Sequence, residues 1–212
     1  MQKDNQIQLT IEIIETAYRL LTHKLAFGGL IAKNEAAFQL EFGYILKTLG
    51  QLYEFRKEDQ FHLEFETYIS LNEQSIKSKS DRARVDLLLN YQDENKKTKA
   101  AIELKYYKKS NHREPNNRYD VFKDISNLEQ YKEHDIDLCY FILATDHEHY
   151  VNQDKYSTDT ADFDFRNDKE YQSKSILKYK TAKPYGPDLQ LKQDYKFQWD
   201  KVNDLYFLKL KV

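Results

Sequence analysis

The apolar run Leu-Cys-Tyr-Phe-Ile-Leu-Ala at residues 138–144 constrains the fold of this chain more than any other segment. A strand with one face in water alternates polar and apolar residues, whereas an uninterrupted apolar strand has both faces covered. The run therefore predicts a sheet packed between two layers. Cys139 within it is the only cysteine of the 212 residues. An internal disulfide or a thiolate metal cage is thus excluded, and we expect a small buried side chain.

Helices and further strands are predicted around this run. Apolar residues recur at helical spacing in three segments, and Asn34 fits the N-cap of the second. The predicted helices are 6–25, 34–52 and 120–133. Alternation predicts a strand at 60–67, and apolar residues favour two more at 84–91 and 100–107. Loops are expected at 70–81 and 108–117, and short strands at 175–181, 195–199 and 206–212.

Composition favours one folded domain. Aromatic residues make up 14% of the chain, with only five glycines and three prolines, which excludes collagen-like and low-complexity sequences. No apolar run approaches the ~18 residues that span a bilayer. Residues 1–5 lack the apolar core of a signal peptide. We therefore expect a single cytoplasmic domain over 1–212, with no membrane partner.

The charge of the chain is unevenly distributed. Residues 77–118 hold twelve Lys or Arg against six Asp or Glu, a net charge of +6 in a chain whose total is −2. A local basic face can bind phosphates on an otherwise acidic protein, although a solvated hairpin explains the same charges. Tyr-Tyr-Lys-Lys at 106–109 combines rings that can stack on bases with ammonium groups that can contact phosphates. Packing at a strand end is the alternative for these tyrosines.

Asp86, Glu103 and Lys105 form the candidate chemical site. Glu103 and Lys105 lie two residues apart on a predicted strand and share one face, and a hairpin brings Asp86 alongside Glu103. Two close carboxylates need a compensating cation or proton, and hard oxygen ligands favour Mg²⁺. Such an ion can activate water and stabilise charge on a phosphodiester, while an ammonium offsets developing negative charge. A surface salt bridge, worth at most ~1 kcal/mol, is the alternative.

These residues resemble the PD-(D/E)XK nuclease superfamily, which has the restriction-endonuclease-like fold. The matching segments are Val-Asp-Leu-Leu-Leu at 85–89 and Ala-Ile-Glu-Leu-Lys-Tyr at 101–106. Segments 118–129 and 141–146 are similar to small stand-alone prokaryotic members. Val85 replaces the proline before the aspartate, a position that varies widely in the superfamily.

The resemblance implies a fold class and a domain layout. The fold is α/β, with a core of helix, three strands, helix and strand that forms a mixed sheet flanked by helices. The core covers about 34–144, preceded by the helix 6–25 and followed by a C-terminal extension of short strands, 145–212.

The resemblance also implies a Mg²⁺-dependent deoxyribonuclease, with Mn²⁺ as a substitute, acting in restriction, defence or repair. Asp86 and Glu103 are the predicted metal ligands, and Lys105 positions the water. An acid on the first core helix assists; Glu41 is the predicted residue and Glu35 the alternative. The expected partner is DNA, with a homodimer left open. Nucleic-acid contacts are predicted at Lys79, Arg82, Arg84, Tyr107, Lys108, Lys109 and Arg118.

Two other hypotheses stay open. One is a catalytically inactive nuclease fold that binds nucleic acid or a protein, and the other is an α/β scaffold with an accidental pattern. The intact Asp, Glu and Lys favour the enzyme. His147 and His149 follow the last core strand, and an HxH pair on a strand can chelate a transition metal. A surface loop pair is the favoured interpretation here.

Overall fold

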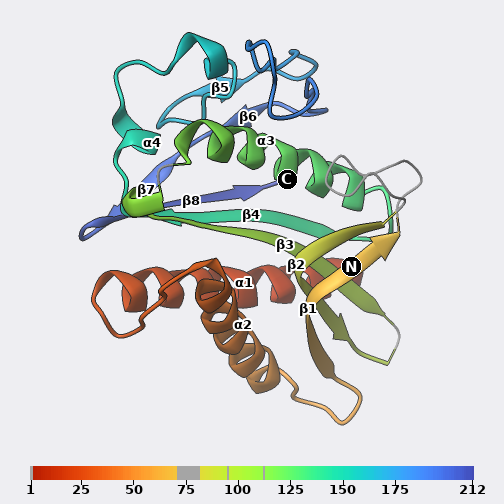
Figure 1. The fold of residues 1–212 in the computed structure, drawn as a ribbon. Coiled ribbons are helices and arrows are strands. Elements are labelled where there is room, and N and C mark those ends of the chain that lie inside the picture. Colours follow the sequence, from red (N-terminus) through yellow and green to blue (C-terminus); the bar gives the residue numbers. More distant parts are fainter. Residues whose placement is uncertain (1, 71–81, 95, 112) are drawn as a thin grey trace.

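A six-stranded sheet between two layers organises the chain, and the computed structural model describes residues 2–70, 82–94, 96–111 and 113–212 (Figure 1). The strand order is β1-β2-β3-β4-β8-β7. Only the β3–β4 pair is parallel among these neighbours, so the sheet is mixed, as predicted. The strands are β1 (Gln60–Ser70), β2 (Arg82–Gln92), β3 (Lys97–Tyr107), β4 (Leu138–Thr145), β7 (Trp199–Val202) and β8 (Leu205–Lys211).

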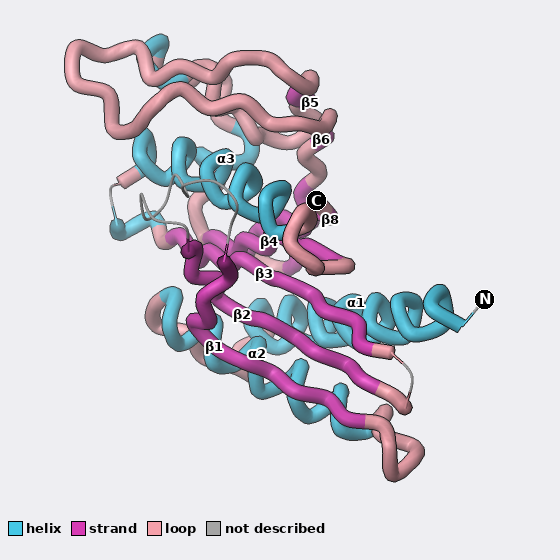
Figure 2. The backbone as a smooth tube through the Cα atoms, turned by 90° about the vertical axis from the view of Figure 1, so that its right-hand side faces the viewer, coloured by secondary structure: helices cyan, strands magenta, loops and turns pink. Residues whose placement is uncertain are grey.

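Helices α1 and α2 cover one face of the sheet, and α3 covers the other (Figures 1 and 2). A separate ladder, β5 (Glu170–Tyr171) with β6 (Tyr195–Lys196), lies beyond α3. The helices are α1 (Gln2–Ala26), α2 (Glu35–Leu52), α3 (Glu114–Tyr131) and α4 (His149–Asn152), with 3-10 turns η1 (Lys109–Asn111) and η2 (Thr158–Thr160). None of the described helices has the length and hydropathy needed to cross a bilayer.

Strand β4 is buried along its whole length, which confirms the prediction from its apolar run. Tyr140 and Ile142 pack in the core between the sheet and helices α1 and α2. Phe141 and Leu143 pack in the core between the sheet and α3. The neighbouring Cys139 is buried with Phe141, as expected for a small core residue. Each face of this strand thus contributes to a different core.

The start of α2 is held against the end of β3. Asn34 caps the helix, since its Oδ1 accepts a hydrogen bond from Ala37 N at 2.8 Å. Phe38, one turn later, stacks on Tyr106 with ring centroids 5.3 Å apart. A capped helix end and an aromatic contact together place the first turn of α2 beside β3.

Helix α3 begins at Glu114, six residues earlier than predicted, inside the segment expected to be a loop. Pro115 lies in its first turn, where a proline has no intrahelical hydrogen bond to lose. The earlier start gives α3 an extra turn and a half beneath the C-terminal extension. The predicted loop at 70–81 lies, apart from Ser70, outside the described residues.

The C-terminal extension contains short strands, as predicted, and its last two, β7 and β8, join the main sheet. The predicted strand 206–212 corresponds to β8, which pairs with β4. The predicted strand 195–199 divides into β6 and the start of β7. The predicted strand at 175–181 is wrong, because the segment forms only an isolated bridge between Leu177 and Leu189. Aromatic contacts hold other parts of the extension against α3, where Phe122 contacts the rings of Phe163, Phe165 and Phe197.

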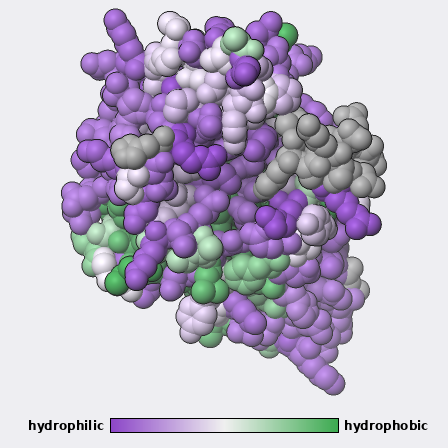
Figure 3. All heavy atoms as spheres, viewed as in Figure 1, coloured by the Kyte–Doolittle hydropathy of each residue, from purple (hydrophilic) through white to green (hydrophobic). Residues whose placement is uncertain are grey.

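Apolar atoms reach the surface mainly over the α1–α2 layer. In Figure 3 the hydrophobic colours gather in the lower part of the molecule, whereas the part above the sheet is predominantly hydrophilic. The exposed apolar side chains include Phe27 and Ile31 between the helices, and Leu40 and Tyr44 on α2. The homodimer stays a prediction.

Candidate functional site

The candidate site lies where β2 separates from β3. The β2–β3 ladder ends at the pair Leu87–Ile102, one position before the register would pair Asp86 with Glu103. On the other side of β2, the residue pairing between β2 and β1 leaves out Glu66, whose backbone has a positive φ of 53°. Asp86 Oδ2 accepts a hydrogen bond from Leu104 N at 2.7 Å, so a side chain bridges the diverging strands. The hairpin therefore brings the Asp86 carboxylate to the backbone of Leu104, the residue between Glu103 and Lys105.

Lys105 is the cation at the centre of the site. Its Nζ lies 2.8 Å from Asp124 Oδ2 and 3.8 Å from Glu35 Oε1, and its side chain is 13% exposed. It also donates to the carbonyl oxygen of Leu104 at 3.1 Å. Burial by itself lowers the pKa of a lysine, but the charges of Asp124, Glu35 and Asp86 outweigh it and hold the pKa of Lys105 well above its usual value. The ammonium is therefore charged at neutral pH.

Glu103 is fully buried between β3 and α3. Its Oε1 accepts a hydrogen bond from the hydroxyl of Tyr131 at 3.1 Å. Burial raises the pKa of Tyr131, and the charge of Glu103 adds to this effect, so the hydroxyl stays protonated and donates. The tyrosine thereby orients one oxygen of the carboxylate.

Glu35 is the helix acid that lies beside Lys105, and the prediction of Glu41 does not match this geometry. Glu35 Oε2 accepts a hydrogen bond from Tyr106 N at 3.2 Å, so both of its oxygens face the end of β3. Glu41 lies six residues further along α2, which places it about 9 Å along the axis and about 240° around it. Burial raises the pKa of Glu35, opposed by Lys105 and the Tyr106 N–H.

Helix α3 supplies residues that sequence reasoning missed. Asp124, which is 1% exposed, contacts Lys105, and Tyr131 contacts Glu103. Residues seven apart lie on one face of a helix, so both side chains face β3. A carboxylate within the apolar face of a predicted helix was the available signal, since Asp124 lies three residues after Val121 and four before Leu128.

The donor set suits a hard divalent cation, although it forms no complete protein cage. Asp86 and Glu103 offer carboxylate oxygens, and Mg²⁺ needs only one or two of these because it keeps several waters. Within the described ranges, no three His, Cys, Asp or Glu side chains are grouped closely enough to hold a metal ion. The two carboxylates are thus ligands of the kind that Mg²⁺ prefers, and the magnesium site stays a prediction.

Four of the predicted nucleic-acid contacts lie at or near the surface. Arg82 and Arg84 are exposed on β2, and Arg84 pairs with Glu66 at 2.6 Å. Lys108 lies over the ring of Tyr106 at 5.8 Å, and Lys109 is exposed in η1. Lys79 lies outside the described residues.

Two of the predicted contacts are wrong, because the side chains are buried. The Tyr107 hydroxyl donates to Asn117 O at 3.1 Å inside the core. Arg118 is 1% exposed, pairs with Glu114 at 2.6 Å and lies over the ring of Tyr156 at 3.7 Å. Both side chains support packing rather than binding.

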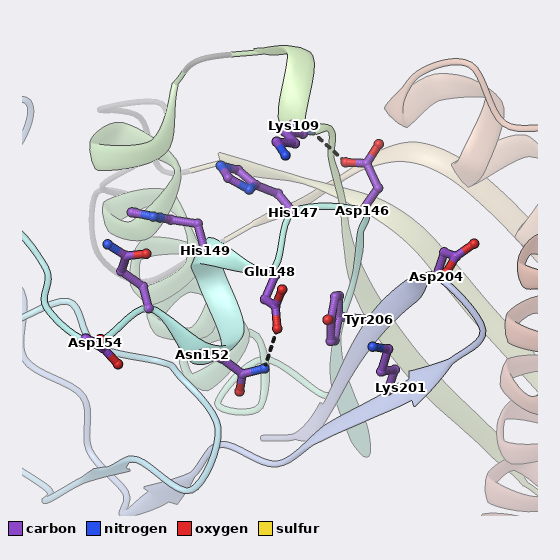
Figure 4. Close-up of a pocket in the computed structure, with 11 residues that line it drawn as sticks. Lys109, Asp146, His147, Glu148, His149, Asn152, Asp154, Lys201, Asp204 and Tyr206 are labelled. Carbon is purple, nitrogen blue, oxygen red and sulfur yellow. Dashed lines mark hydrogen bonds between the residues drawn. The ribbon is translucent and has the colours of Figure 1, made fainter.

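A polar pocket of about 600 Å³ lies beyond the ends of β3, β4 and β8 (Figure 4). Asp146 accepts a hydrogen bond from Lys109 N at 2.6 Å at one side of it. The rings of His147 and His149 stack at 5.3 Å, and His149 Nε2 lies 2.9 Å from Glu114 Oε1. Burial, together with His149 and Lys109, lowers the pKa of His147. The pair follows β4 and enters α4, so the strand-borne arrangement suited to metal chelation is not formed.

Comparison with known proteins adds no relative: no family model, curated protein or solved structure matches this chain. The resemblance to the PD-(D/E)XK superfamily stays a prediction that depends on the residues named above.

Proposed function

We propose that this protein is a metal-dependent nuclease that hydrolyses phosphodiester bonds of DNA. The observation that supports this proposal most is the convergence of Asp86, Glu103 and Lys105 at the separation of β2 and β3. Glu35 on α2 adds a further carboxylate, with its Oε1 3.8 Å from Lys105 Nζ. Three side chains from two strands and one from a helix thus lie around the point where β2 and β3 separate.

Each residue has a chemical role in this proposal. Asp86 and Glu103 would hold Mg²⁺, which would supply charge to polarise the phosphate and to activate a water. Lys105 places its ammonium where negative charge develops, and Asp124 and Glu35 keep that ammonium protonated. The water oxygen forms a new bond to phosphorus, the bond to the leaving sugar oxygen breaks, and that oxygen takes up a proton.

The second candidate is a nuclease-like fold that binds nucleic acid or protein without cutting. The complete burial of Glu103 favours it, because a metal ligand needs an approach from solvent. The pairing of Lys105 with Asp124 favours it as well, since a buried ion pair can serve the fold alone. Single-turnover incubation with Mg²⁺ and a pool of duplex, single-stranded and branched DNA separates the candidates. Binding without cleavage of any form supports the second.

Metal binding is expected to depend on both strand carboxylates. Calorimetric titration with Mg²⁺ or Mn²⁺ should show binding by the parent protein and a loss of binding in Asp86→Ala and in Glu103→Ala, because each removes a hard oxygen ligand. Glu133→Ala is the matched control, since Glu133 is an exposed carboxylate that pairs with Lys192. If both site variants bind the ion as tightly as the control does, the metal site lies elsewhere.

DNA affinity is expected to fall steeply with salt and to depend on the basic residues after β3. Lys108→Glu/Lys109→Glu should weaken binding and reduce the slope of log affinity against log salt by roughly 2, one unit per lost phosphate contact. The fold should be retained, because Lys109 is exposed and Lys108 only partly buried. Lys178→Glu/Lys180→Glu carries the same charge change on the C-terminal extension and should leave the slope unchanged. If the slope of log affinity against log salt is the same in both double variants, Lys108 and Lys109 do not contact the phosphates.

A further inference from the structure

Asn127 is a buried amide whose hydrogen-bonding groups are unused by the protein. Its side chain has no exposed surface. Across the part of the chain that the structure describes, neither its Oδ1 nor its Nδ2 has a hydrogen-bond partner. A buried polar group without a partner is costly, and native proteins satisfy nearly all such groups with protein atoms or ordered water. This amide therefore needs a partner from solvent or from a ligand.

The position of Asn127 links it to the candidate site. It lies three residues after Asp124 and four before Tyr131, so the three side chains share one face of α3. Asp124 contacts Lys105 and Tyr131 contacts Glu103, which means that α3 runs antiparallel to β3 along this seam. Along the axis of α3, Asn127 therefore lies between the residue that contacts Lys105 and the residue that contacts Glu103.

We infer that Asn127 holds a water molecule between Glu103 and Lys105 and is a positioning residue for hydrolysis, an inference that rests on the proposed function. An amide can donate to a carboxylate-bound water and accept from it at once. A water needs two to four polar partners in a buried site, and the seam offers a carboxylate, an ammonium and this amide. The water would link α3 to the strand residues that carry the chemistry.

Asn127→Leu is the variant that tests the role in hydrolysis. Leucine has the same branching as asparagine, but it carries two methyl groups in place of the amide oxygen and nitrogen and so cannot bind water. We expect the single-turnover cleavage rate to fall roughly 10- to 100-fold, with DNA affinity within about twofold of the parent, because only the reacting geometry is disturbed. Asn127→Ser, which keeps a hydroxyl and leaves room for water, should recover part of the rate. A parent-like rate in the folded Leu variant would overturn the inference, as would equal losses in the Leu and Ser variants.

Asn117→Leu is the matched control. Asn117 is buried on the same helix, ten residues and about 15 Å along its axis before Asn127, and its Nδ2 already donates to the hydroxyl of Tyr150 at 2.8 Å. This variant should lower the urea midpoint of unfolding and leave the cleavage rate of the folded protein unchanged. If it slows cleavage as much as Asn127→Leu does, general loosening of α3 explains both results and the inference fails.

A crystal structure at high resolution tests the inference without any cleavage. It should show a water roughly 2.7–3.2 Å from an amide atom of Asn127 and within the same distance of Glu103 or Lys105. An amide paired with a protein group, or a dry seam, would overturn the inference even in an active nuclease. If the parent cuts no DNA while the water is present, the proposed function fails and the water-binding role of Asn127 stands.

Discussion

Lys105→Ala is expected to slow DNA cleavage by roughly two orders of magnitude or more, the scale of losing one electrostatic stabiliser of a transition state. It is also expected to lower the free energy of unfolding by about 3–5 kcal/mol, because the variant leaves the buried charge of Asp124 without the ammonium that lies 2.8 Å away. Single-turnover cleavage and urea unfolding measure the two effects separately. A parent-like rate would remove Lys105 from the mechanism.

A double variant separates the loss of chemistry from the loss of stability. Lys105→Met/Asp124→Asn removes both buried charges and should recover most of the stability while leaving the cleavage rate low. Lys105→Arg should rescue the rate only in part, because a planar guanidinium does not replace a compact ammonium. Lys99→Ala is the control on the same strand. Lys99 pairs with the exposed Asp135, so its loss should cost less than about 1 kcal/mol and leave cleavage unchanged.

Glu103→Gln is expected to retain the fold and to slow cleavage by roughly two to three orders of magnitude. Glutamine has nearly the same shape, and its amide oxygen can still accept the hydrogen bond from Tyr131, so packing of the buried side chain is preserved. The negative charge that would hold the metal is lost, so Mg²⁺ affinity measured by calorimetry should fall together with the rate. Retention of both by the folded variant would contradict the assignment of Glu103 as a ligand.

Glu129→Gln is the matched control for that experiment. Glu129 is also buried, but its carboxylate accepts hydrogen bonds from Lys192 N, Gln193 N and the Tyr195 hydroxyl, which fasten the C-terminal extension to α3. Loss of its charge should cost about 1–3 kcal/mol of unfolding free energy. The cleavage rate of the folded protein should stay at the parent value. Comparison of Glu103→Gln with Glu129→Gln therefore distinguishes a buried carboxylate that takes part in the reaction from one that only stabilises the fold.

Much of the fold could be predicted because its signals are local. The apolar run at 138–144 and the helical spacing within α1 and α2 predicted elements that the structure contains. The hairpin of β2 and β3 was predictable for a similar reason, since the strands are adjacent in the chain. Which acid of α2 lies beside Lys105, Glu35 or Glu41, was not predictable in this way. It depends on how α2 packs on β3, where Phe38 stacks on Tyr106.

The sequence by itself determined most of the strands and helices and the hairpin of β2 and β3, because side-chain periodicity specifies which faces are buried, whereas the mixed sheet was expected from the family resemblance. Only the tertiary structure decided that Asp124 faces Lys105, that Arg118 and Tyr107 are buried, and that β8 completes the sheet beside β4. These features arise from contacts between segments far apart in the chain. Periodicity within a segment shows that a face is covered, but the covering partner depends on how the whole chain packs.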